Sequence, residues 1–250
     1  MSGHPTRQGW FSAESVDCNP LPPPREHPYR LVLLGPPGVG KGTQASLLSE
    51  YTRACHLSTG ELFRAAKCQH TPSPAMRLAL EAMRRGELVS DDVVISMVRE
   101  RLTCLHCPGG FSLDGFPRTV RQARELDQML AESELTLDAV ICYELPLEEI
   151  VSRLGGRRTC SDCRAVYHVT ANPPSTPDVC DQCGGALVLR EDDHPTAIRR
   201  RMQIYHADTE PLIDYYAATG KLLRIEAVGT PESIRARTVE ALHALLSAVA

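Results

Sequence analysis

The stretch with the clearest chemistry is Gly-Pro-Pro-Gly-Val-Gly-Lys-Gly-Thr at 35–43. An apolar run precedes it at 30–34, and apolar residues at helical spacing follow it. In this context glycines let backbone N–H groups converge on phosphate oxygens, and the start of the next helix adds positive potential. Lys41 supplies a mobile charge for the outer phosphates. We therefore predict a phosphate-binding loop, and the alternative is a tight strand-to-helix turn without a ligand.

Magnesium must be held differently here than in the general phosphate-loop motif. Where that motif has a serine or threonine after the lysine, this chain has Gly42, and the hydroxyl comes one residue later at Thr43. Asp114, at the end of another apolar run, is the candidate to reach Mg²⁺ through water, because this ion keeps much of its hydration. The alternative for Asp114 is a turn-forming pair with Gly115. We expect phosphates, water and Asp114 to share the ion.

A second set of residues has the spacing of metal ligands. The set is Cys160, Cys163, Cys180 and Cys183. Two CxxC pairs separated by 16 residues fit a tetrahedral Cys₄ zinc site. Four thiolates fill the coordination shell, so the zinc would be structural and would clip a small module. The alternatives are two redox pairs or four buried thiols. A further pair, Cys104 and Cys107, has no partner pair, and we interpret it as unrelated to metal.

Charge and hydropathy exclude several classes of partner. The formal net charge is −4, so a non-specific binder of nucleic acid or of an anionic membrane is not expected. Arginine clusters on such a chain suit a small polyanion. No apolar run reaches the length of a membrane span, and the N-terminus has no apolar signal core. We therefore expect a cytoplasmic protein, in which the ten cysteines do not indicate disulfides.

The elements that must position these residues alternate between strand and helix. Expected strands lie at 30–34, 54–57, 111–113, 139–144 and 222–225. Expected helices lie at 43–51, 60–67, 74–85, 91–103, 119–132, 147–154, 197–216 and 231–248. This alternation predicts an α/β fold of three layers, with a central parallel sheet covered on both faces and ligands beyond the carboxyl ends of its strands.

Two segments depart from that rhythm. Residues 1–28 contain six prolines, and we expect a disordered extension before a core at 29–250. Residues 155–193 carry the paired cysteines and little helical periodicity, and we expect an inserted module that resembles a zinc ribbon.

Four stretches, in order along the chain, resemble nucleoside monophosphate kinases. They are the loop at 35–43, LSTGELFRAA at 57–66, LDGFPRTVRQA at 113–123 and GRRTC at 156–160. Together they are most similar to adenylate kinases with a long zinc-bearing lid, and the resemblance covers nearly all of the chain after the extension. It implies reversible transfer of the terminal phosphoryl group of MgATP to AMP, giving two ADP. It also implies an AMP-binding lid at about 59–89 and a second lid at about 155–193.

The resemblance assigns roles residue by residue. It implies ATP contacts at Gly38, Val39, Gly40, Lys41, Gly42, Thr43, Arg153, Arg157, Val166, Tyr167 and Pro231. It implies AMP contacts at Thr59, Arg64, Glu87, Leu88, Val89, Gly115, Phe116, Pro117, Arg118, Gln122, Arg190 and Arg201. It implies catalytic roles for Lys41, Asp114, Arg118, Arg157, Arg190 and Arg201. Asp192 and Asp193 would pair with the lid arginines when the lid is closed.

Two of these assignments have a competing interpretation. Thr59 favours AMP, since kinases of pyrimidine monophosphates tend to have alanine there, yet another acceptor, or GTP as the donor, is an alternative. Gln122 would hydrogen-bond adenine, but Thr119-x-x-Gln122 is also a capping box at a helix start.

Other classes of protein remain as alternatives to a monomeric kinase. One is a zinc-ribbon protein that binds nucleic acid and has a phosphate-loop switch, and another is a structural protein that binds nucleotide without turnover. The negative charge argues against the first, and intact Lys41, Asp114 and Arg118 argue against the second.

Overall fold

The computed structural model describes residues 27–66, 74–85, 87–99 and 105–249. The expected extension at 1–28 lies almost entirely outside these residues, as does Cys104. Among the described residues, no helix is long and apolar enough to cross a membrane.

A sheet of five parallel strands forms the centre, in the order β2-β3-β1-β4-β8. Its strands are β1 (Tyr29–Leu34), β2 (Cys55–Ser58), β3 (Gly110–Asp114), β4 (Ala139–Glu144) and β8 (Leu222–Glu226). The predicted parallel sheet is therefore confirmed, with strand bounds within one or two residues of expectation. All five strands end at the same edge, where the 35–43 loop leaves β1.

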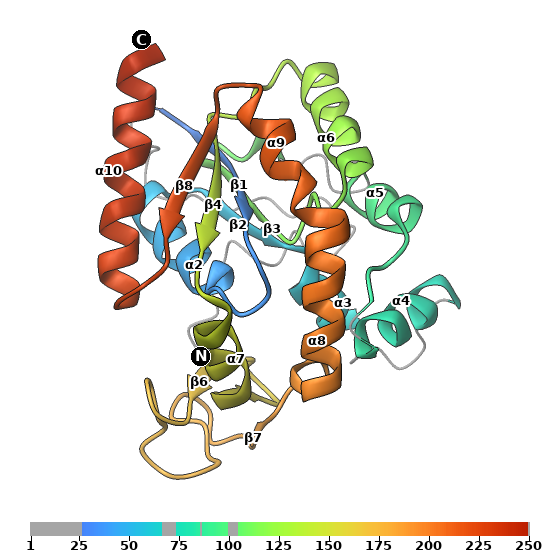
Figure 1. Cartoon of the computed structure of the whole chain (residues 1–250), viewed down its shortest axis with the longest axis vertical. Coiled ribbons are helices and arrows are strands. Elements are labelled where there is room, and N and C mark those ends of the chain that lie inside the picture. The colour runs from blue at the N-terminus through green and yellow to red at the C-terminus, as the bar shows by residue number, and fades with distance from the viewer. Residues whose placement is uncertain (1–26, 67–73, 86, 100–104, 250) are drawn as a thin grey trace.

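Helices cover both faces of this sheet (Figure 1). Consecutive residues of β1 point to opposite faces, so Leu31 and Leu33 lie in one apolar cluster and Val32 and Leu34 in the other. The first face is covered by α2 (Lys41–Thr52) and α10 (Pro231–Val249), and the second mainly by α3 (Thr59–Ala66), α5 (Asp91–Arg99), α6 (Val120–Glu132) and α9 (Pro211–Ala217). The three predicted layers are present.

A small module projects beyond the carboxyl edge of the sheet (Figure 1). It follows α7 (Leu147–Gly156) and contains an antiparallel sheet in the order β6-β5-β7. Its strands are β5 (Arg157–Cys160), β6 (Val166–His168) and β7 (Leu187–Val188). Its buried cluster consists only of Cys160, Tyr167, Cys180 and Leu187. A core this small does not hold a module together without a further link.

The segment after the module is helical, as predicted, but it is not one regular helix. It comprises α8 (Pro195–Ile204), a π-helical turn (Tyr205–Thr209) and α9, while a 3₁₀ turn (Glu191–Asp193) precedes it. Pro211 lacks a backbone N–H, so the hydrogen-bond pattern must change before it. One further helix, α4 (Pro74–Arg84), lies between α3 and α5 in the chain.

Candidate active site

The 35–43 loop joins the central strand β1 to α2, in the predicted position. Gly40 precedes the helix with a φ of 103°, in the left-handed region that glycine adopts without strain. Arg153 of α7 contacts the loop directly, since its Nη1 donates to the Val39 carbonyl at 3.3 Å. The loop is thus fixed between the sheet and α7.

Lys41 lies inside the loop that it was predicted to serve. Its Nζ donates to the carbonyls of Gly35 at 2.6 Å and Pro36 at 2.9 Å. Burial lowers the pKa of the Lys41 amine to about 8, and the charges of Arg118 and Arg201 lower it too, whereas Asp114 opposes the change. A phosphate that displaces the two carbonyls would meet a partly buried amine that already points into the loop.

This pKa predicts a pH dependence for nucleotide binding. The amine is charged below about pH 8 and neutral above it, so ATP affinity should weaken roughly tenfold between about pH 7 and pH 9. Calorimetry at several pH values would also detect proton uptake on binding above about pH 8. In Lys41→Arg any remaining binding should lack this step, because a guanidinium stays charged. A flat profile in the unsubstituted protein would contradict the assignment.

Asp114 ends β3 beside the loop and faces it. Its Oδ2 lies 3.5 Å from Nε2 of His56, a buried residue of β2. Burial alone would raise the pKa of Asp114, but His56, Lys41 and Arg118 outweigh it and hold the pKa at about 2. A side chain at position 42 would begin 3.6 Å from Asp114 Oδ2. Gly42 therefore leaves room between loop and carboxylate for hydrated Mg²⁺, and these residues fit that ion.

His56 was not among the predicted site residues. Among the described residues, neither ring nitrogen has a hydrogen bond of regular geometry, although Nε2 approaches the Asp114 carboxylate to 3.5 Å. The sequence signal that could have identified His56 was its position in the strand that leads directly to Thr59. The structure pairs that strand, β2, with β3, which carries Asp114.

A second cavity lies between α3, the end of α4 and the start of α6. Its described lining includes the predicted AMP contacts Thr59, Glu87, Leu88, Val89, Gly115, Arg118 and Gln122. Thr59 Oγ1 donates to the Gly115 carbonyl at 2.9 Å. A Cβ at Gly115 would lie 2.8 Å from that hydroxyl and 3.0 Å from an Arg118 nitrogen, and its φ is 82°. Position 115 therefore requires glycine, and the predicted acceptor residues are brought together.

Five of the predicted AMP contacts stand apart from this lining, and two of them, Arg190 and Arg201, belong to the arginine group described below. Phe116 and Pro117 are buried, with Phe116 in the core, so they position the neighbouring Arg118. Arg64 belongs to α3, but its side chain lies outside what the structure describes.

Gln122 shows how the capping and ligand roles divide. Thr119 caps α6 by accepting from the Gln122 backbone N–H at 3.1 Å. The Gln122 side chain does not complete the capping box, because its Oε1 accepts from the Arg118 N–H at 2.8 Å. Its Nε2 donates to Asp91 at 2.7 Å. Asp91, which the sequence did not single out, thus fixes the orientation of the Gln122 amide. The second N–H of that amide could donate to the base of AMP.

Two of the predicted phosphate-binding arginines, Arg157 and Arg201, converge on one buried carboxylate. Asp193 accepts from Arg157 at 2.7 and 2.5 Å and from Arg201 at 3.1 Å. Arg201 also pairs with Asp192 at 3.1 Å, and Arg190 donates to Thr159 at 2.8 Å. Asp193 is 1% exposed, so the carboxylate that aligns these two partly exposed guanidinium groups is itself shielded from water.

Replacing Asp193 should disturb catalysis more than binding. In Asp193→Asn one charge is lost and Arg157 and Arg201 repel each other, so we expect kcat to fall about 10- to 100-fold with a smaller change in KM. Steady-state kinetics would measure this. Asp192→Asn is the matched control, since Asp192 is more exposed than Asp193 and also pairs with Arg201. Equal small effects in both variants would contradict the alignment role.

Two of the predicted ATP contacts outside the loop, Arg153 and Pro231, lie near the residues that follow β8. Arg153 Nη2 donates to the Ala227 carbonyl at 2.9 Å, beyond the end of β8, and the Pro231 carbonyl accepts from Gln44 at 2.9 Å. These contacts place Arg153 and Pro231 beside the loop. Tyr167 is buried within the lid, whereas Val166 is exposed there.

The four predicted cysteine ligands are assembled in the lid. Their sulfur atoms all lie within 4.8 Å of one another, with Cys160 to Cys183 at 3.4 Å and Cys163 to Cys180 at 3.5 Å. Thiolates bound tetrahedrally at about 2.3 Å from zinc stand roughly 3.8 Å apart. The cluster therefore fits a four-coordinate zinc ion.

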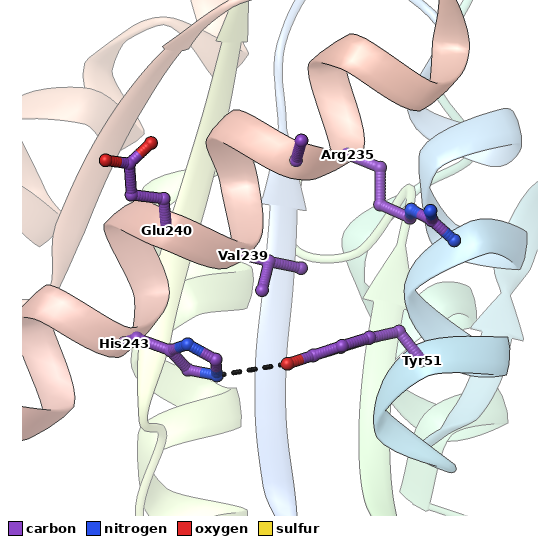
Figure 2. A pocket seen from close by; sticks show the side chains of 6 residues that line it. Tyr51, Arg235, Val239, Glu240 and His243 are labelled. Carbon is purple, nitrogen blue, oxygen red and sulfur yellow. Dashed lines mark hydrogen bonds between the residues drawn. The ribbon is translucent and has the colours of Figure 1, made fainter.

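The larger of the described hollows lies away from this chemistry, between α2 and α10. Its volume is about 450 Å³, and it is lined by Tyr51, Arg235, Ala236, Val239, Glu240 and His243. Tyr51 and His243 point toward each other, with 3.3 Å between the hydroxyl and Nε2 (Figure 2). It contains none of the predicted site residues, so we do not assign it to phosphate chemistry.

Comparison with known proteins is consistent with this geometry. A family model described as adenylate kinase matches residues 33–221. The chain is 51% identical over 214 residues to an adenylate kinase of Acidothermus cellulolyticus, covering 86% of this chain and 98% of that one. It is 48% identical to that of Carboxydothermus hydrogenoformans, covering 86% and 99%. For Streptomyces avermitilis the identity is 47%, over 85% and 96%.

Proposed function

The chain belongs to the adenylate kinase family and is an enzyme that transfers a phosphoryl group between ATP and AMP, and we propose which of its residues carry out that transfer. The observation that supports the assignment best is that the phosphate loop, Asp114 and the Thr59–Arg118 pocket meet at one edge of the sheet.

The donor phosphates bind the loop, where Lys41 exchanges its two carbonyl partners for phosphate oxygens. Asp114 and the space beside Gly42 hold hydrated Mg²⁺, which supplies charge neutralisation on the transferring group. Arg157, Arg190 and Arg201 approach from the lid, and Arg118 from the acceptor side. No general base or covalent nucleophile is required, because phosphoryl transfer depends on alignment and neutralised charge.

Two mobile parts admit the substrates. The acceptor cavity measures about 30 Å³ in this structure, which holds little more than a water molecule. AMP therefore enters only if the segment at about 59–89 moves outward, and the lid at about 155–193 opens for ATP in the same way. Their closure excludes water, which would otherwise compete as the acceptor.

The zinc ion in this proposal is structural. The four cysteines fill a tetrahedral shell and leave no coordination site for substrate. Arg157 begins the strand that carries Cys160, and Arg190 follows β7. The ion would therefore keep the strands that present these two arginines in register.

An acceptor panel tests the substrate assignment. ADP formation from ATP should be fastest with AMP, and UMP or CMP should react at least about tenfold more slowly. Thr59→Ala should reduce the difference in rate between AMP and the pyrimidine monophosphates. Thr59→Ser should preserve that difference, because it keeps the hydroxyl that donates to the Gly115 carbonyl. A preference for UMP or CMP, or equal use of GTP as donor, would reject the base assignment.

The remaining assignments are also proposals. We expect a cytoplasmic monomer without a nucleic-acid or membrane partner, because the net charge is −4 and the arginines serve the nucleotides. The molar mass from light scattering would test the monomeric state. Tight, salt-sensitive binding of RNA or DNA without phosphoryl transfer would favour the alternative of a zinc-ribbon protein that binds nucleic acid.

A further inference from the structure

Two cysteines outside the metal cluster and the active site face each other. Cys55 begins β2, and Cys107 lies in the turn before β3. Their sulfur atoms are 2.6 Å apart, closer than the Cys160–Cys183 and Cys163–Cys180 pairs of the four-cysteine cluster. Both side chains belong to the same buried cluster, with exposures of 1% for Cys55 and 7% for Cys107.

The backbone around this pair is tightly held. Cys55 stands opposite Phe111 in the parallel ladder between β2 and β3. The Gly110 N–H closes a turn by donating to the Cys107 carbonyl at 2.8 Å, and the Gly109 carbonyl accepts from Tyr29 at 3.2 Å. Gly109 also packs so closely on Arg53 that a Cβ would collide with its carbonyl oxygen. Because the sulfurs already lie 2.6 Å apart, linking them requires little movement of these restrained segments.

We propose that Cys55 and Cys107 form a disulfide under oxidation by a peroxide. The thiolate of Cys107, the more exposed residue, attacks one peroxide oxygen; an S–O bond forms, the O–O bond breaks, and the released hydroxide takes the thiol's proton and leaves as water. The Cys55 thiolate then attacks the resulting sulfenic acid, the S–S bond forms, and the hydroxide takes a proton to give a second water. Two thiols are oxidised and one hydrogen peroxide is reduced.

The location gives this bond a specific consequence. The two cysteines are 52 positions apart, and the whole acceptor segment at about 59–89 lies between them. The bond closes a covalent loop at the base of the segment that must open for AMP, and neither cysteine belongs to the described lining of the acceptor cavity. It should restrain unfolding of the second face of the sheet without blocking the acceptor cavity.

Peptide mapping of the full-length, zinc-loaded protein tests the proposal. After treatment with hydrogen peroxide and alkylation of the remaining thiols, digestion without reductant should yield a linked peptide pair containing Cys55 and Cys107. The melting temperature should rise by roughly 5 to 10 °C, as expected for a cross-link that closes a loop of this length, and a reductant should reverse it.

Variants separate this bond from oxidation elsewhere. Cys55→Ser and Cys107→Ser should each abolish both the linked peptide and the increase in melting temperature, relative to their own untreated state. Cys68→Ser and Cys18→Ser should retain both. A linkage of Cys107 to Cys104, or overoxidation of Cys107 with Cys55 still alkylated, would overturn the proposal. An equal temperature increase in Cys107→Ser would do the same.

Discussion

Lys41→Ala should lower kcat/KM for ADP formation by about 10³-fold or more while leaving the fold intact. The amine is the cation closest to the donor phosphates in the proposed complex, and it acts in a partly buried site in which desolvation lowers its pKa. Single preorganised donors contribute 10²- to 10³-fold in comparable sites, and a full positive charge on a transferring phosphoryl group contributes at least as much.

The fold should tolerate this substitution because Lys41 does not stabilise it. A buried amine with a lowered pKa favours its neutral form, so removing it should leave the melting temperature unchanged or slightly higher. Lys221→Ala is the matched control, since that residue lies just before β8, at the opposite edge of the sheet. Near-normal transfer in Lys41→Ala would contradict the role given to the loop.

Local sequence patterns were sufficient for the fold and for the first contacts of the site. The strand before Gly35 is short, apolar and followed by a glycine-rich stretch, so both its type and the position of Lys41 could be predicted. The paired cysteines likewise specify their own cluster, because each CxxC pair presents two thiols from one turn.

Residues that act through other residues could not be found in this way. His56 lies beside Asp114 only because β2 and β3 pair in one particular register, and Asp91 reaches Gln122 from a separate helix. The 2.6 Å approach of Cys55 to Cys107 depends on the same pairing. Such contacts link segments more than 30 residues apart or lie across strands, and no periodicity in the sequence encodes them. Asp192 and Asp193 were the exception, because the family resemblance, rather than any local spacing, pointed to their pairing with arginines.

Removing the zinc should have the largest effect on structure. We expect Cys180→Ser to reduce zinc from about one ion per chain to well below one and to unfold the lid, while the five-stranded sheet persists. The reason is the size of the lid core, in which four side chains are buried and two of them are the cysteines themselves. Binding free energy of the metal is folding free energy in modules of this kind.

Loss of zinc should unfold the lid and leave the rest of the chain folded, and this difference can be measured segment by segment. Hydrogen exchange or limited proteolysis should report loss of protection between Cys160 and Val188 in Cys180→Ser, with β1 and β4 unchanged. Transfer should fall about 10- to 100-fold, because Arg157 and Arg190 stand at the two boundaries of that module and lose their alignment with Asp193 and Thr159. Cys18→Ser, which keeps all four ligands, is the control. Full protection of the lid in a protein without zinc would show that the cysteines hold it by packing alone, and the metal assignment would then be wrong.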